Sequence, residues 1–81
     1  MSTEEAKTVH NYIIEHNLLN EVEARTKAKW KNMGSRTSYY VGMSKAQNGA
    51  MTSLVEGLMI LEAHALMVEH SKNALQVQEA A

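Results

Sequence analysis

Aromatic and basic side chains gather in one part of this sequence, and together they could bind a nucleotide. The segment 20–36 holds five basic residues, Arg25, Lys27, Lys29, Lys31 and Arg36. Phe is absent, and all the Tyr and Trp residues are Tyr12, Trp30, Tyr39 and Tyr40. A flat ring can stack on a base while a neighbouring cation meets a phosphate. The structural alternative buries Trp30, which we favour, together with Tyr40, leaves Tyr39 half exposed, and makes the cations a solvated helix face.

The remaining titratable residues form no recognisable catalytic or metal-binding motif. His10 and His16 are six residues apart, as are His64 and His70, whereas histidines that chelate from one helix face are four apart. The chain has no Cys, so thiolate metal sites and disulfides are excluded. Neither a nucleophile elbow nor a phosphate-binding glycine loop is present. We therefore predict a protein that is not an enzyme and has no metal and no cofactor.

Length and charge narrow the class of protein further. The chain of 81 residues is one domain at most, and a chain this short buries only about 60% of its unfolded surface, so a monomeric core would be marginal. The net charge is −1, and the segment 20–36 carries five basic against two acidic residues. Such a segment suits a small anionic ligand better than a nucleic acid polymer. We expect no signal peptide and no contact with a membrane, because no apolar run approaches the roughly 20 residues of a membrane span.

The composition predicts an all-α fold, because proline is absent and strong helix formers are common. A capping box, Ser2-x-x-Glu5, begins a first helix that runs to about residue 16. A weaker signal of the same kind, Asn20-x-x-Glu23, begins a second helix over roughly 20–33, which Gly34 would end.

A third helix, capped by Ser35 or Thr37, should continue to about Leu75. Its apolar residues fall on two lines: Tyr40, Met43, Met51, Leu54, Leu58, Leu61, Ala65 and Val68 on the first, and Val41, Val55, Met59, Ile60 and Leu66 on the second. About 40 residues give a helix of about 60 Å, too long for the short helices to cover. The predicted fold is thus a short N-terminal helix plus an antiparallel helical hairpin with one long C-terminal helix. The uncovered length indicates an oligomer, or a bend that folds the C-terminal part back.

Small residues recur along this third helix at positions 42, 46, 49, 53 and 57. Steps of three and four place them on one helix face. Each interior glycine costs a helix about 1 kcal/mol relative to alanine, so a closely packed neighbour should offset the loss. We therefore predict a tight helix or subunit interface at Gly42, Ala46, Gly49 and Ser53.

The order of residues from 25 to 51 resembles a known family. Arg-x-Lys-Ala-Lys at 25–29 precedes a basic residue at 36 and the run Val41-Gly42-x-Ser44-Lys45-Ala46-Gln47-x-Gly49-x-Met51. This order is similar to the helical-hairpin domain of the phage anti-CBASS and anti-Thoeris nucleotide sponges, although Ala46 stands where that family usually has Leu. The resemblance covers about residues 10–56 of the single domain 1–81 and leaves 57–81 as a helical extension.

The resemblance implies a phage protein in the cytoplasm of an infected bacterium. It would form a homo-oligomer, a hexamer, and sequester cyclic di- or trinucleotides for immune evasion without cleaving them. The family's dinucleotide site lies between subunits and implies Tyr12 as the stacking ring and Lys27 as the phosphate contact. Lys29 and Arg36 would add charge. The family's trinucleotide site uses an Arg where this chain has Val55 or Glu56, and a carboxylate there would repel a phosphate.

Other functions remain compatible with the same residues. A small helical phage structural or assembly protein would use the small-residue face for subunit contacts alone. A small adaptor could instead inhibit a host protein directly. A nucleic-acid-binding protein fits least well, because the overall charge opposes it.

Overall fold

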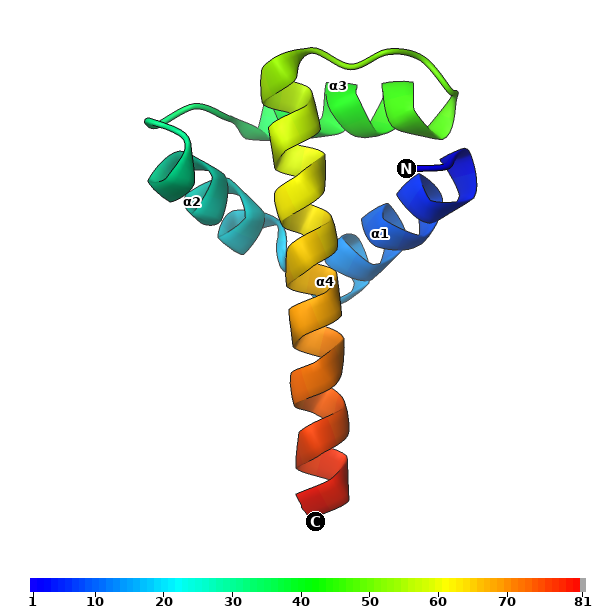
Figure 1. Ribbon diagram of the computed structural model, residues 1–81, viewed down its shortest axis with the longest axis vertical. Coiled ribbons are helices and arrows are strands. Elements are labelled where there is room, and N and C mark those ends of the chain that lie inside the picture. Colours follow the sequence, from blue (N-terminus) through cyan, green and yellow to red (C-terminus); the bar gives the residue numbers. More distant parts are fainter. Residues whose placement is uncertain (81) are drawn as a thin grey trace.

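The computed structural model describes the backbone of residues 1–80 and the side chains of residues 1–75. Its helices are α1 (Thr3–Glu15), α2 (Leu19–Lys29), α3 (Arg36–Gln47) and α4 (Leu54–Ala80). Helix α4 lies in front of the other three, with α3 across its N-terminal end and its C-terminal part extending beyond them (Figure 1). The described backbone contains no strand, so the predicted all-α class is confirmed.

Two of the predicted helix starts are confirmed by their caps. The hydroxyl oxygen of Ser2 accepts a hydrogen bond of 3.1 Å from the backbone N–H of Glu5. Ser35 likewise accepts one of 3.2 Å from the backbone N–H of Ser38. The start predicted at Asn20 is wrong, because α2 begins at Leu19 and its N-cap Leu18 makes no side-chain capping bond.

Helix α2 also ends earlier than predicted, at Lys29 instead of near residue 33. The chain turns through two left-handed residues, Lys31 at φ 55° and Asn32 at φ 62°, before Gly34 at φ 107°. Gly34 therefore lies in the loop that leads to α3 and does not end α2. Trp30 is the C-cap at this turn and is exposed, so its predicted place in the core is wrong.

The single long third helix is also wrong, because the chain breaks between Gln47 and Leu54. Gly49 adopts φ 73° directly after α3. Ser53 and Glu56 then form a capping box: the Ser53 hydroxyl accepts from the Glu56 N–H at 3.3 Å, and Glu56 Oε1 accepts from the Ser53 N–H at 2.8 Å. The result is the bend expected as the alternative, with α3 folded onto α4.

The core forms where α1, α2 and α3 pack against α4, and α1 also packs against α3. Its hydrophobic residues are Ala6, Val9, Ile13, Leu18, Leu19, Val22, Tyr39, Met43, Met59, Ile60, Ala63 and Leu66. Tyr39 is buried and Tyr40 is exposed, the reverse of the structural alternative, because Tyr39 faces α1 and bonds His10 (3.0 Å). The boundary predicted between residues 56 and 57 falls within the first turn of α4, whose next residues belong to this core.

None of the helices in the described part of the chain combines the length and hydropathy needed to cross a membrane.

Candidate functional site

Tyr12, the predicted stacking ring, belongs to a cluster of three rings between α1 and α4. Its ring centroid lies 4.1 Å from that of His16 and 5.6 Å from that of His70. A hydrogen bond joins its hydroxyl to Nδ1 of His70. The side chain is half-buried, and His16 lies against one face of its ring.

The predicted phosphate-binding cations are paired with carboxylates or stand apart. Lys27 Nζ lies 3.4 Å from Glu23 Oε1. Lys29 Nζ lies 3.2 Å from Glu62 Oε1. Arg36 is exposed at the first turn of α3, and no ion pair is formed by it among the described side chains. Within residues 1–75, no hydrogen bond, ion pair or ring contact joins Tyr12 to any of these three cations, so one copy does not assemble the predicted site.

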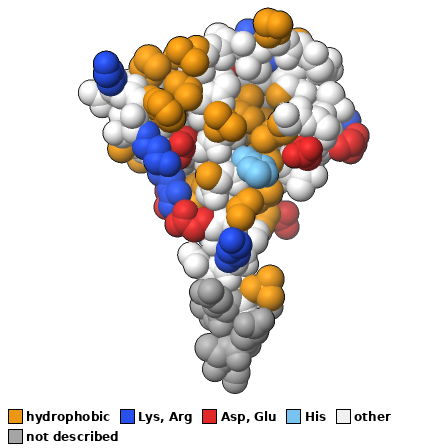
Figure 2. Space-filling model, viewed as in Figure 1, with side chains coloured by type: hydrophobic (Ala, Val, Ile, Leu, Met, Phe, Trp, Pro, Cys, Tyr) orange, Lys and Arg blue, Asp and Glu red, His pale blue; other side chains and the backbone are white. Residues whose placement is uncertain are grey.

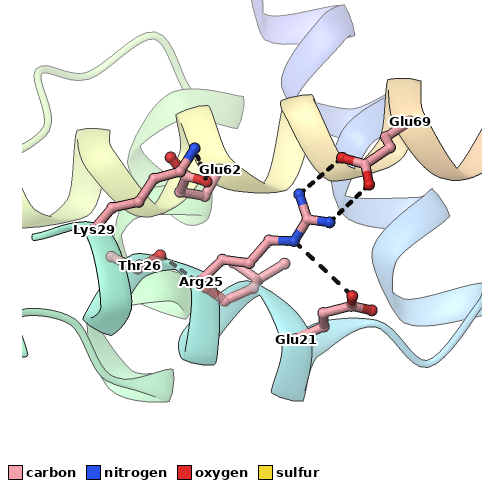
Figure 3. A network of polar contacts seen from close by, with 7 residues as sticks. Glu21, Arg25, Thr26, Lys29, Glu62 and Glu69 are labelled. Carbon is pink, nitrogen blue, oxygen red and sulfur yellow. Dashed lines mark hydrogen bonds and ion pairs between the residues drawn. The ribbon is translucent and has the colours of Figure 1, made fainter.

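Two of the five basic residues of the segment, Arg25 and Lys29, instead join α2 to α4, as Figure 3 shows. Arg25 donates two hydrogen bonds of 2.9 Å to the two carboxylate oxygens of Glu69. These bonds raise the pKa of Arg25 and lower the pKa of Glu69. Arg25 Nε also lies 3.9 Å from Glu21. The positive charge of this segment is therefore largely neutralised by the protein's own carboxylates.

Glu62 stands out in this network because it is buried. It sits on α4 beneath Lys29, and its Oε1 has no hydrogen bond partner among the described residues, although Lys29 Nζ forms an ion pair with it. A buried carboxylate keeps its charge only beside a compensating cation. Lys29 thus stabilises the protein's own core, and an incoming phosphate would have to compete with Glu62 for it.

The small residues predicted to form an interface do not share one helix face, so the prediction of a shared face is wrong, whereas their contact with another subunit stays a prediction. Gly42 and Ala46 lie in α3, Gly49 is in the following turn, and Ser53 caps α4. The expected close approach occurs inside the chain at Gly42, where an added Cβ would stand 2.8 Å from the Cβ of Glu56. Glycine at 42 therefore lets α3 approach α4.

An apolar stripe runs along the surface of α4. Its residues, which we call the outer stripe, are Leu54, Leu58, Leu61, Ala65, Val68 and Leu75. Leu54 is 74% exposed, Leu61 is 62% exposed and Leu75 is 56% exposed. At 100° per residue, the outer stripe lies opposite the buried side of α4, which holds Met59 and Ala63. Figure 2 shows hydrophobic side chains following α4 down this face of the molecule.

An apolar groove adjoins the N-terminal end of the outer stripe. It has a volume of ≈ 580 Å³ and lies between the N-terminus, the loop 49–53 and the stripe residues Leu54, Leu58 and Leu61. Met51, in this loop, is 92% exposed. Leu54, Leu58 and Leu61 belong to both the groove and the outer stripe, so the two apolar surfaces adjoin.

The described residues contain no candidate metal site. Among them, no three His, Cys, Asp or Glu side chains are grouped so that they could hold a metal ion. The chain matches no family model, no curated protein and no solved structure.

The sequence contained the signal for the outer stripe, since its first five residues are the α4 part of the first apolar line. The structure places Met59, Ile60 and Leu66 of the second line in the core. It leaves Leu54, Leu61 and Val68 of the first line exposed. Sequence alone could not show which line the other helices would cover.

Proposed function

We propose that this protein is a helical self-association module, of the assembly or adaptor type, that pairs through the outer stripe of α4. The observation that carries the proposal is that α4 is apolar on two opposite sides and the other helices cover only one of them. An apolar helix face is normally buried against another element. A second copy of the chain would complete that burial.

The spacing of the outer stripe supports pairing with another helix. Its steps of four and three residues are those of the a and d positions of a coiled coil. From Leu54 to Val68 the stripe contains no charged residue, and this part spans about 21 Å of helix. Lys72 then occupies the step before Leu75.

The exposed leucines set the scale of the expected affinity. Full burial of a Leu side chain is worth about 1.5–3 kcal/mol. Leu54 and Leu61 each have most of that gain still available, and a symmetric pair contains both twice. Association costs about 4–15 kcal/mol in lost freedom. Because gain and cost are of similar size, these leucines alone give weak association, and a micromolar dissociation constant would need a further net gain of about 8 kcal/mol from the rest of the interface.

The test is the mass in solution, measured by light scattering over a range of protein concentrations. We expect a wild-type mass above that of the monomer and a monomeric Leu61→Glu variant. Ile14→Glu is the matched control, because Ile14 is also an exposed aliphatic residue but lies on α1; it should assemble as the wild type does. Circular dichroism should show both variants folded. A monomeric wild type at every concentration would refute the proposal.

As a second candidate we propose the sequestration of cyclic oligonucleotides, as in the anti-CBASS sponges of phages. The cluster of Tyr12, His16 and His70 favours it, because three rings close together offer flat surfaces to bases. Residues of a second copy, as in a hexamer, would have to complete the site, since Lys27 and Lys29 already face carboxylates. Such a protein would act in the host cytoplasm and would need no catalytic group.

Calorimetry with a panel of cyclic di- and trinucleotides tests this second candidate. We expect sub-micromolar binding, intact ligand after heat release, and loss of dinucleotide binding in Lys27→Ala. The exposed pair of Lys27 with Glu23 is worth at most about 1 kcal/mol, so the variant should stay folded. Absence of binding heat with every member of the panel would eliminate sequestration and leave the self-association proposal standing.

A further inference from the structure

We infer that two copies of this chain pair antiparallel along α4, with the two-fold axis level with residue 63. The inference rests on the self-association proposed above and adds the orientation and register of the pair. Three features carry it: the order of large and small residues in the outer stripe, the position of Lys72 between Val68 and Leu75, and the groove at the N-terminal end of the stripe.

Large and small residues are distributed unevenly along the outer stripe. In heptad notation, Leu58, Ala65 and Lys72 occupy a positions, while Leu54, Leu61, Val68 and Leu75 occupy d positions. The first half of the stripe is therefore leucine throughout. The second half has the small side chain of Ala65, the β-branched side chain of Val68 and the cation of Lys72 before Leu75.

A parallel pair in register would place each residue opposite its own copy. Ala65 would face Ala65 and leave a void, which a close-packed interface does not tolerate. Lys72 would face Lys72 one heptad further on, where two ammonium groups repel each other. The second half of the stripe would then contribute little to such a pair.

An antiparallel pair instead places a positions opposite d positions and matches large residues with small ones. With the axis level with residue 63, Leu61 faces Ala65 and Leu58 faces Val68. Lys72 then lies at each end of the interface opposite Leu54, where its aliphatic stem can cover the leucine while its ammonium group reaches water. A lysine at a single a position is a known determinant of register.

The groove supplies a further match in the same register. Leu75 of one copy comes nearly one helical turn beyond Leu54 of the other, toward the loop 49–53, which holds Met51 and lines the groove. The side chains of Leu75 and Met51 are largely exposed in the single copy. Helices α1, α2 and α3 all lie behind α4 in Figure 1, so they leave this approach open.

Disulfide trapping tests the orientation directly, because the chain has no cysteine of its own. Leu54→Cys and Lys72→Cys are made as separate variants, mixed and oxidised. In the antiparallel pair position 54 of one copy lies opposite position 72 of the other, within the roughly 7 Å between Cα atoms that a disulfide requires. Identical positions lie 18 residues apart along the helix, about 27 Å. We expect the mixed disulfide between positions 54 and 72 as the main linked dimer and neither variant to link to itself.

The possible outcomes distinguish this inference from the proposal of self-association on which it rests. Linkage of 54 to 54 and of 72 to 72 would show a parallel pair and overturn the inference while self-association stood. An oligomer by light scattering that gives no disulfide at either position would show that positions 54 and 72 are not opposite each other, and would also overturn the inference. A monomeric wild type would refute self-association itself. Ile14→Cys mixed with either variant is the control and should give no linked dimer.

Discussion

The two glycines inside helices, Gly42 in α3 and Gly57 in α4, should respond in opposite directions to the same change to alanine. At Gly42 the new Cβ would stand 2.8 Å from the Cβ of Glu56 and 3.3 Å from its Cα. At Gly57 it would meet only the hydroxyl oxygen of Thr52, at 3.4 Å, an ordinary contact. Neither glycine has a positive φ, so the difference between the sites is one of space.

The magnitudes follow from these contacts. Alanine in place of a helical glycine gains up to about 1 kcal/mol, and Gly57→Ala should keep most of that gain. At Gly42 the neighbouring atoms cannot rotate away, because the Cβ and Cα of Glu56 are fixed by the backbone of α4 and no side-chain rotation moves them. Overpacking of this kind costs about 1–3 kcal/mol. The two variants should therefore differ by about 1–3 kcal/mol, with Gly42→Ala the less stable.

Thermal and urea unfolding, followed by far-ultraviolet circular dichroism, provide the measurement. A difference of about 1 kcal/mol shifts the melting temperature of a domain this size by about 4–8 °C. All samples need the same protein concentration, because the stability of an oligomer depends on it. If Gly42→Ala raised the stability as much as Gly57→Ala, the close approach of α3 to α4 would be refuted.

Two further predictions concern pH. Burial raises the pKa of the Tyr39 hydroxyl, so the folded state favours the neutral phenol. This preference adds fully to the free energy of unfolding below the ordinary pKa of about 10, and the addition is lost as the pH rises above that value. Tyr39→Phe should therefore flatten the alkaline loss of unfolding free energy, and an unchanged slope would contradict the burial. Hydrogen bonds from the Ser53 backbone and from Lys45 lower the pKa of Glu56. The ionised carboxylate therefore adds to the free energy of unfolding above about pH 4.3, and this addition is lost in acid. Glu56→Gln should be less stable than the wild type at about pH 7, with the gap closing below about pH 4, as acid and urea titrations can measure.

Features that depend on residues close together in the chain could be predicted from the sequence. The caps at Ser2 and Ser35 depend on residues three positions apart. The buried side of α1, with Val9 and Ile13, follows from helical periodicity. The break before α4 also has a local signal, the capping box Ser53-x-x-Glu56. The apolar pattern conceals it by continuing on both sides of the loop, since α3 and α4 face one core.

The candidate site depends largely on contacts between side chains that are far apart in the sequence, which the sequence does not predict. The pairing of Lys27 with Glu23 has helical spacing and could have been predicted. Arg25 and Glu69 are 44 residues apart, and their pairing is a consequence of how α2 packs on α4. The burial of Glu62 beneath Lys29 has the same origin. For this reason three of the five cations in a segment that is basic in the sequence face carboxylates in the folded protein.

The capping box at Ser53 and Glu56 also bears on the order in which the helices assemble. It joins residues 3 apart, and the bond from Lys45 to Glu56 spans 11 positions, whereas the bond from Tyr12 to His70 spans 58. Closing a short loop loses less entropy than closing a long one. We therefore expect the α3–α4 hairpin to be formed in the transition state for folding and α1 to dock after it. Gly42→Ala should then act mainly by slowing folding, and Tyr12→Phe mainly by accelerating unfolding.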